Sequence, residues 1–470
     1  MSDKPRTISL HERKEVFDPA EIKTVLTERI REFIPPPGSD SHQPVWLHWR
    51  FPLRHLDPLS WLSIQNHPTR IYWKNRRGDF ETAGVGNAFH VHSLYPVDFN
   101  LLFARMRRMI ADQPDIRVFG GFSFFNRTGK SSLWYPFGNY RFWIPRFEVQ
   151  RHHNQTFFVM TARLHSRDAW QELQTFLLSS LQELQFDISP ALPNLPPLEI
   201  RKDFPDYRGW SAMMANALEF IAAGKMSKIV LARKSEFHFR ETIDALSLLE
   251  QVHSPSGHQY EFYFQPRKSH AFWGVSPERL YRRQGSQLWS EAIAGTRPRG
   301  TTNRDDLLLE NELRSNEKEL REHRRVMAHL RRVFQQLCNH ISESPEISVL
   351  KLKHLQHLYW QIEGTLFPNG DDARIMRHLH PTPAVGGTPA QHALPLIREL
   401  EPFERGWYAA PVGWISTEAA EFAVAIRSAL VHKNTVHVYA GAGIVSGSTP
   451  QQEWEEIENK ITPVRRLLQG

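Results

Sequence analysis

The fold class is decided between residues 228 and 275, where the chain reads KIVLARKSEFHF (228–239), QYEFYFQP (259–266) and HAFWGV (270–275). These runs are short and rich in aromatic and β-branched residues, which is typical of β-strands. A helical pattern, GWSAMMANALEFIAAG (209–224), precedes them, and the later runs follow as successive strands. Helices interleaved with directly successive strands favour a mixed, largely antiparallel α+β fold over a doubly wound parallel sheet.

The first 200 residues fit the same fold class. Between about 45 and 165 the chain consists mainly of short strand patterns separated by turns, namely PVWLHWRF, TRIYWKN, IRVFGGFSFF, YRFWIPRFEVQ and TFFVMTARL. The proline-rich passage SPALPNLPPLEIRKDFP (189–205) is the best candidate for a boundary or for a strap across the surface. Further on, we expect a helical block at 305–340 and a last helix at about 450–467.

The composition excludes several classes of protein. Cys338 is the only cysteine among the 470 residues, so neither an internal disulfide nor a cysteine-based zinc site can form. No apolar run approaches the roughly 20 residues that span a bilayer. The charged N-terminal residues also lack the apolar centre of a signal peptide. We therefore expect a cytoplasmic protein with no membrane partner.

The net charge of +7 suits either a nucleic acid or a small anionic substrate. The densest basic cluster, REHRRVMAHLRR (321–332), lies in an amphipathic helix pattern, so its arginines are expected on a solvated face. No zinc-finger, RNP-type or helix-turn-helix signature is present. We therefore expect no nucleic-acid partner, and the charge equally suits an enzyme for a small anionic substrate.

Two pairs of carboxylates share the same helical spacing. Glu319 and Glu322 are three residues apart on one predicted helix, and Glu453 and Glu456 repeat this spacing near the start of the last helix. Each pair alone is more often part of a solvated face, and Lys460 follows Glu456 at i+4. Both pairs together could also converge on Mg²⁺, which takes one or two carboxylates, keeps waters and binds an anionic substrate.

A second group of residues suits acid–base chemistry on an anion. Lys228 begins a buried strand pattern, where desolvation favours the neutral amine that a base requires. Glu278 follows Ser-Pro at the end of a strand and could serve as an acid at a pocket rim. The glycine-rich turns at 292–300 and 440–444 offer backbone N–H groups to anions, and Arg427 could clamp a carboxylate.

Two histidines, His354 and His357, lie among apolar neighbours in KHLQHL. Because no third ligand is nearby in the sequence, we interpret them as core or surface histidines rather than as a metal pair.

Nine motifs occur in order within residues 205–470, namely KIVLAR, GVSPERL, EAIAGTRPRG, NEKELREHRRV, LHPTPAVGG, GWYAAPVGW, AIRSALV, YAGAGIVSGS and EWEEIENKI. Together they closely resemble the chorismate-utilising enzymes, the family of isochorismate, salicylate, anthranilate and aminodeoxychorismate synthases. Upstream, residues 61–86, 119–124 and 140–149 resemble the corresponding region of menaquinone-pathway isochorismate synthases.

The resemblance implies a single large α+β fold, in which two orthogonally packed antiparallel β-sheets are flanked by helices. Residues 1–200 would form the N-terminal strand-rich half of this fold, and residues 201–470 its chorismate-binding catalytic region. This expectation replaces the two to three domains that chain length alone suggests.

The resemblance also implies a reaction with water. Family members that use water carry a lysine at the first position of KIVLAR, as Lys228 does here, whereas members that use ammonia typically carry glutamine. Aminodeoxychorismate synthases have a nucleophilic lysine where this chain has Ala294, so covalent catalysis at that position is excluded. Ala292 replaces the usual proline of that motif, which removes no reacting group.

The implied activity is the Mg²⁺-dependent conversion of chorismate to isochorismate, feeding menaquinone, phylloquinone or siderophore synthesis. Lys228 would be the base and Glu278 the acid. Mg²⁺ would be held by Glu322 and Glu456, with Glu319 and Glu453 assisting through water. The residues that match the family's substrate contacts are Gly295, Thr296, His380, Tyr408, Arg427, Gly443 and Lys460.

Two alternatives remain. A salicylate synthase would use the same base and acid and then eliminate pyruvate. An inactive relative or a basic binding protein belongs to another class, and the complete set of acid, base and metal positions argues against it. No glutamine amidotransferase partner is expected, because water rather than ammonia attacks.

Overall fold

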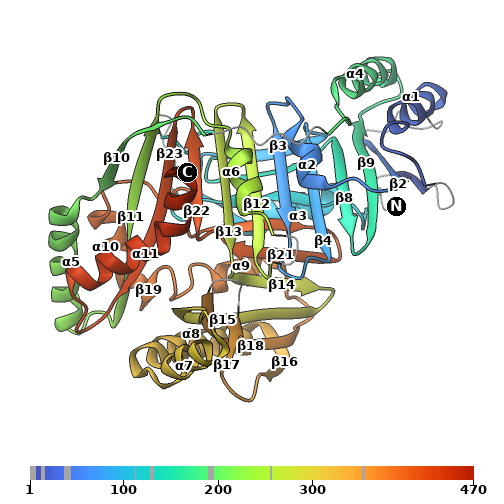
Figure 1. Ribbon diagram of the computed structural model, residues 1–470. Coiled ribbons are helices and arrows are strands. Elements are labelled where there is room, and N and C mark those ends of the chain that lie inside the picture. Colours follow the sequence, from blue (N-terminus) through green and yellow to red (C-terminus); the bar gives the residue numbers. More distant parts are fainter. Residues whose placement is uncertain are drawn as a thin grey trace.

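The computed structural model describes residues 7–11, 16–35, 44–111, 113–126, 132–188, 195–254, 257–351 and 355–469. Within these residues the strands form two large sheets, whose named strands pair antiparallel except for β1 with β2. In Figure 1 the strands of the larger sheet run up the view, and those of the second sheet, such as β14 and β15, run across it. The predicted α+β class with two orthogonally packed antiparallel sheets is confirmed.

The larger sheet holds 13 of the described strands in the order β1-β2-β9-β8-β4-β3-β12-β13-β22-β23-β11-β10, with β19 also paired to β11. Its strands are β1 (Thr7–His11), β2 (Val45–Leu53), β3 (Arg70–Lys74), β4 (Phe80–Val85), β8 (Phe147–His152), β9 (Gln155–Leu164), β10 (Leu198–Phe204), β11 (Lys228–Phe239), β12 (Tyr260–Arg267), β13 (His270–Ser276), β19 (Gly387–Thr388), β22 (Ser428–His432) and β23 (Thr435–Ile444).

The second sheet holds 10 of the described strands in the order β16-β18-β15-β14-β21-β20-β6-β7-β5, with β17 also paired to β18. Its strands are β5 (Phe89–Ser93), β6 (Val118–Phe122), β7 (Tyr140–Ile144), β14 (Arg279–Gln284), β15 (Gln287–Pro298), β16 (Cys338–Glu343), β17 (Ser348–Lys351), β18 (Leu355–Leu366), β20 (Pro411–Ile415) and β21 (Ala419–Val424).

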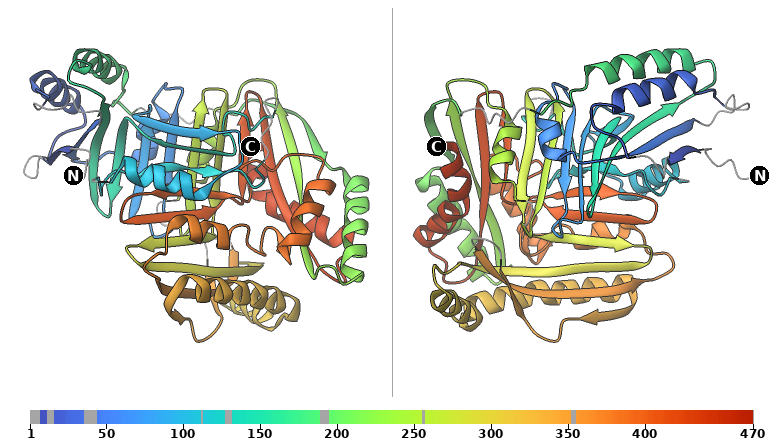
Figure 2. Two further views of the ribbon diagram at one scale, coloured as in Figure 1. Left: turned by 180° about the vertical axis from the view of Figure 1, so that it is seen from behind. Right: turned by 45° about the vertical axis from the view of Figure 1, so that its right-hand side comes forward.

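Helices cover the outer faces of both sheets. The described helices are α1 (Ile22–Glu32), α2 (Pro58–Ser63), α3 (Phe99–Met109), α4 (Trp170–Glu183), α5 (Tyr207–Ala222), α6 (Ala245–Val252), α7 (Asn303–Ser315), α8 (Glu317–Leu337), α9 (Asp372–Leu379), α10 (Ala390–Leu400) and α11 (Pro450–Gln469). Helix α8 packs along β15 and β18, while α5, α10 and α11 pack on β11 and β23. The right-hand view of Figure 2 shows α7 and α8 below the strands of the second sheet. No described helix has the length and apolar character needed to cross a bilayer.

Strand alternation divides the apolar side chains between two cores. On β3, Trp73 belongs to the core between the sheets, which also holds Phe119 of β6 and Trp414 of β20, and Trp414 contacts Phe80 of β4 in the larger sheet. Tyr72, the neighbour of Trp73 on β3, points to the opposite face, into the core beneath the helices that cover the larger sheet. Adjacent strand residues point to opposite faces, so the larger sheet is buried on both sides.

Strands from early and late parts of the chain are neighbours in both sheets. Strand β3 pairs antiparallel with β12 in the larger sheet, and β6 pairs antiparallel with β20 in the second. The residues on either side of position 200 therefore build the same two sheets.

Three local expectations differ from the structure. The strands at 228–239 and 259–266 are separated by helix α6, which Asp244 caps by accepting from the Leu246 N–H at 3.2 Å. The expected helical block at 305–340 is divided into α7 and α8 at Asn316, whose side chain caps α8. The proline-rich passage lies outside the described residues at 189–194, and its later part is not a linker but strand β10, which pairs with β11.

Candidate active site

Lys228 begins strand β11 and is buried, as its apolar neighbours predict. Its Nζ donates to Glu322 Oε2 of helix α8 at 3.0 Å. Strand β23 runs beside β11, and Gly443 of β23 approaches the lysine so closely that an added Cβ would lie 2.7 Å from Lys228 Cε. Glycine at this position therefore leaves room for the lysine side chain to reach the site.

Glu278 lies two residues beyond the end of β13, where its backbone N–H donates to Ser276 Oγ at 3.2 Å. The carboxyl group is buried. Burial and, to a lesser extent, the negative charge of Glu291 raise its pKa to about 7, while the positive charge of Lys228 opposes the shift. A buried carboxylic acid that retains its proton near neutral pH can act as a general acid.

The two predicted carboxylate pairs meet between α8 and α11. Lys318 of α8 lies 3.4 Å from Glu453 Oε1 of α11, which brings the two helices together at this point. Burial raises the pKa values of Glu319 and Glu453, and the neighbouring carboxylates Glu322 and Glu456 raise them further. Like charges that are gathered and partly desolvated in this way require a compensating cation.

Cations already compensate part of this charge. Burial opposes ionisation of Glu456, but Lys460, Lys318 and Lys228 together hold its pKa below the usual value. Glu453 Oε2 is buried and has no hydrogen-bond partner among the described residues. Among all described residues, no group of three or more His, Cys, Asp or Glu side chains is arranged closely enough to hold a metal ion.

A strand irregularity shapes the opposite side of the site. The register of β15 against β18 shifts between Ala294 and Arg297, and Gly295 lies in this bulge with a φ of 67°. A bulge takes residues out of the ladder and turns their backbone toward other partners. An added Cβ on Gly295 would lie 3.0 Å from Glu319 Oε2, so the bulge adjoins the carboxylate cluster.

His357 of β18 joins this bulge to Arg427. Its Nδ1 lies 2.9 Å from the backbone oxygen of Gly295 and 3.1 Å from Thr296 Oγ1, and Arg427 Nη2 lies 3.3 Å from its Nε2. Burial and, to a lesser extent, the Arg427 cation lower the pKa of His357 to about 3. A neutral ring therefore donates from Nδ1 to Gly295 and accepts from Arg427 at Nε2.

Arg427 is a half-buried cation. Burial lowers its pKa to about 10, and no described carboxylate forms an ion pair with it. Its backbone lies in the left-handed region with a φ of 50°. A guanidinium held in this way by His357 is suited to bind a carboxylate of a ligand.

Lys460 and Tyr408 complete the anion-binding side. Lys460 Nζ donates to the backbone oxygen of Gly441 at 2.8 Å and to Glu456 Oε1 at 2.7 Å. Tyr408 is buried and stacks on Tyr439, with the ring centroids 5.3 Å apart. An added Cβ on Gly441 would lie 3.2 Å from the Tyr408 hydroxyl, so this hydroxyl lies beside strand β23.

His380 was predicted to contact the substrate. No described interaction links it directly to the other predicted site residues. It follows α9, and its ring meets Phe124 edge-on at 5.5 Å. Burial lowers its pKa to about 3, and neither ring nitrogen has a hydrogen-bond partner among the described residues. The remaining predicted residues, from Lys228 to Lys460, gather in one site.

The sequence interpretation missed the role of His357, which was expected to be a core or surface histidine. It is buried, as a core residue would be, but its two nitrogens connect three predicted substrate contacts. The pairing of β15 with β18 puts it there, and residue spacing does not reveal that pairing. His354 lies outside the described residues.

The comparisons with known proteins identify the family of the chain. The family model of the chorismate binding enzymes matches residues 29–469. The chain is 34% identical over 397 residues to isochorismate synthase 2 of Arabidopsis thaliana, covering 82% of this chain and 70% of that one. It is 33% identical over 426 residues to isochorismate synthase MenF of Escherichia coli, covering 89% and 92%.

The fold is similar to solved structures of the same group. The structure of MenF, the menaquinone-specific isochorismate synthase from Escherichia coli, matches with a TM-score of 0.83 and 30% identity. The match covers 96% of this chain and 99% of the other. The resemblance drawn from the nine motifs is confirmed, and the chain belongs to the chorismate-binding enzymes.

Proposed function

We propose that the chain is an isochorismate synthase, which adds water at C2 of chorismate and releases the hydroxyl group from C4. The observation that carries the proposal is the buried pair of Lys228 and Glu278, whose charges act on each other within one site. A lysine and a protonated carboxyl group can take and give a proton in one reaction. Relatives that cover most of the chain are isochorismate synthases.

The chemistry follows from these two groups. Lys228 Nζ takes a proton from water as the water oxygen bonds to C2. The ring double bonds shift, the C4–O bond breaks, and Glu278 donates its proton to the departing oxygen. One water molecule enters and one leaves, so substrate and product are isomers. Because Lys228 is ion-paired with Glu322, that carboxylate needs another cation before the amine can act as a base.

The residues present fit a Mg²⁺ ion. Carboxylate oxygens are the ligands that Mg²⁺ prefers, and Glu453 Oε2 is a buried oxygen without a partner among the described residues. We assign Glu322 and Glu456 as direct ligands, with Glu319 and Glu453 acting through water. When bound, the ion would offset the negative charge of the ring carboxylate.

The substrate is a dianion, and the site provides cations for it. We assign Arg427 to one carboxylate, since this half-buried cation has no acidic partner in the described part of the chain. Thr296, Gly295 and Lys460 would contact the substrate from the β15 bulge and from α11, and Tyr408 and Gly443 from the β23 side. His380 remains a candidate for contact with the substrate ring, although its imidazole forms an edge-to-face contact with Phe124.

The decisive experiment is to incubate the purified protein with chorismate and Mg²⁺ and to separate the products by HPLC. We expect isochorismate without pyruvate. Stoichiometric salicylate and pyruvate would assign the chain to the salicylate synthases instead, and no turnover would refute the proposal. EDTA should abolish the activity, and added Mg²⁺ should restore it.

A lysine variant tests the assigned base. Lys228→Ala should lower the turnover by about 10²- to 10⁴-fold, the usual contribution of a general base. Lys225→Ala is the matched control, because Lys225 is exposed three residues upstream. Full activity of Lys228→Ala would refute the assignment.

We further propose that the product feeds a quinone pathway, by extension from the menaquinone-specific relative in Escherichia coli. The gene should restore menaquinone to a bacterium that lacks its own isochorismate synthases. Unrestored menaquinone despite soluble, active protein would refute this assignment.

A further inference from the structure

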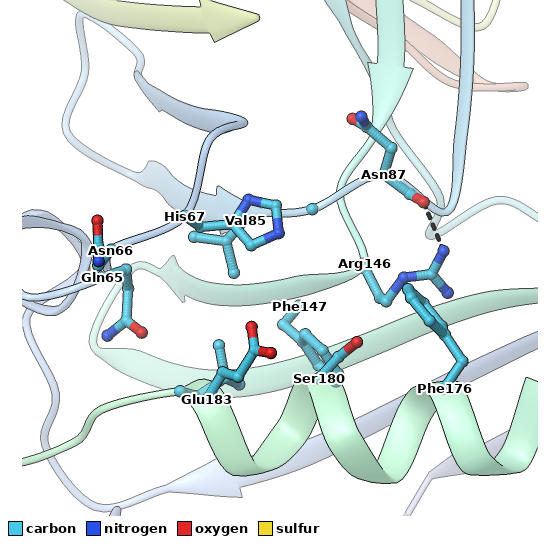
Figure 3. A pocket seen from close by; sticks show the side chains of 12 residues that line it. Gln65, Asn66, His67, Val85, Asn87, Arg146, Phe147, Phe176, Ser180 and Glu183 are labelled. Atoms are coloured by element: carbon cyan, nitrogen blue, oxygen red, sulfur yellow. Dashed lines mark hydrogen bonds between the residues drawn. The ribbon is translucent and has the colours of Figure 1, made fainter. Parts of the chain in front are cut away.

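A cavity of about 250 Å³ lies apart from the candidate active site, between helix α4 and the ends of β3, β4 and β8. The residues that line it are Gln65, Asn66, His67, Val85, Gly86, Asn87, Arg146, Phe147, Phe176, Ser180, Glu183 and Leu184. Figure 3 shows Arg146 and Phe176 at one end of the cavity and Glu183 at the other, with Phe147 between them. None of these residues belongs to the machinery described above.

Arg146 is the cation of this cavity, and it lacks an acidic partner. Its Nη2 donates to the backbone oxygen of Asn87 at 2.6 Å, as the dashed line in Figure 3 marks. Its Nη1 is buried and has no hydrogen-bond partner among the described residues. The guanidinium lies over the ring of Phe176 at 4.7 Å. Burial alone lowers the pKa of Arg146 to about 10, so no described carboxylate compensates its charge.

One side of the cavity is apolar, and one position is kept small. Val85, Phe147 and Leu184 are buried. Gly86 has a φ of +71°, and an added Cβ would lie 3.2 Å from Arg146 Cβ. A side chain there would be strained and would crowd the base of the arginine. The carboxylate of Glu183 belongs to an exposed residue, so its charge is largely screened by water.

We propose that this cavity binds a small carboxylic acid with a flat apolar body. The carboxylate would accept from Nη1 of Arg146, and the body would lie against Phe147 and Leu184. A buried, unpaired guanidinium N–H is costly unless an anion occupies it, and the aromatic ring of Phe176 fixes the orientation of the guanidinium. The volume lies below the range of about 300–1,000 Å³ for drug-sized ligands, which excludes nucleotides and larger cofactors. The proposal is independent of the assigned reaction.

The probe is 4-bromobenzoate, titrated into the full-length protein by calorimetry, with neutral 4-bromobenzamide as its matched control. We expect the acid to bind and the amide to bind at least about tenfold more weakly, since hydrogen bonds to charged groups are the stronger ones. In crystals soaked with the acid, the anomalous signal of bromine should lie in the cavity beside Arg146.

Three variants separate this cavity from the active site. Arg146→Met should weaken binding of the acid by about 10- to 100-fold, whereas Arg167→Met removes the same charge from an exposed position and should leave binding unchanged. Ser180→Phe keeps the arginine but fills the cavity, and it should also abolish binding. It tests the proposal even if Arg146→Met does not fold.

Other outcomes would overturn the proposal. The absence of binding, equal binding of the amide, or binding that survives Ser180→Phe would each show that the cavity does not recognise carboxylates. Loss of binding in Arg427→Met, together with a bromine signal at Arg427, would place the acid in the active site instead.

Discussion

Glu278 is buried in the site and Arg427 is half-buried, and desolvation affects their charges in different ways. Glu278 is favoured in its neutral, protonated form, because burial and Glu291 raise its pKa to about 7. Arg427 remains charged although burial lowers its pKa to about 10. The site therefore holds both a proton donor and a cation that can bind an anion.

The pKa of Glu278 predicts the alkaline side of the pH profile. Because the acid must carry its proton, kcat/KM should fall as the pH rises above about 7, approaching a tenfold loss per pH unit. Glu291→Gln removes a negative charge that raises this pKa, so it should move the decline to lower pH. Glu261→Gln, which removes a buried carboxylate paired with Lys74, should leave the decline in place. A decline unmoved by Glu291→Gln would contradict the assignment.

His357 should act on substrate binding through Arg427. His357→Ala removes the acceptor at 3.3 Å from Arg427 and frees the guanidinium, so KM for chorismate should rise about 10- to 100-fold with a smaller change in kcat. Steady-state kinetics measure both constants. His378→Ala, at an exposed position on α9, is the control. A pure loss of kcat would show that His357 acts on the chemical step instead.

Many residues of the site could be predicted from the sequence. The residues whose roles were not predicted correctly were missed for physical reasons. The strand position of Lys228 and the helical spacing of Glu319 and Glu322 are local properties that a sequence shows directly. The role of His357 depends on the register between β15 and β18, which only the folded sheet defines. His380 fits a motif, but its ring faces Phe124 rather than the other contacts.

At the scale of elements, two strands shape the site through their backbones. The bulge in β15 turns Gly295 toward His357, and Gly443 of β23 lets Lys228 lie against that strand. The glycine-rich turns were predicted to offer backbone groups, but in the structure these residues belong to strands. The missed helix α6 is eight residues long, too short for the helical period to be distinct from a loop.

Strand β23 offers a test of this arrangement. Gly443→Ala would place a Cβ 2.7 Å from Lys228 Cε, so the lysine must shift, and kcat should fall by at least about tenfold. Ala442→Gly is the control, because Ala442 lies on the opposite face in the core beneath the helices. That variant should cost about 1 kcal/mol of stability and leave kcat unchanged. Equal kcat values for the two variants would contradict the close approach of Gly443 to the Lys228 side chain.

At the scale of the whole molecule, the two halves of the chain are interleaved rather than stacked. Arg70 of β3 and Gln265 of β12 are strand partners and also form a side-chain hydrogen bond across 195 residues of sequence. Fragments 1–188 and 195–470 should therefore be unfolded or aggregated when expressed separately, because each exposes unpaired sheet edges. Circular dichroism and tryptophan fluorescence of the full chain should report coincident denaturant transitions.

The contrary result would be a fragment 195–470 that is soluble and has the near-UV spectrum of a packed protein. Two separate transitions in the full chain would have the same meaning. Either result would show that the catalytic region folds independently of the N-terminal strands.

The pairing of β6 with β20 has a consequence for synthesis of the chain. When the ribosome has made the first 200 residues, β3 and β6 exist, but their partners β12 and β20 begin only at Tyr260 and Pro411. The nascent N-terminal half therefore exposes unpaired strand edges until most of the mRNA has been translated. Chaperones that hold such edges should therefore determine how much active enzyme a cell obtains from each transcript.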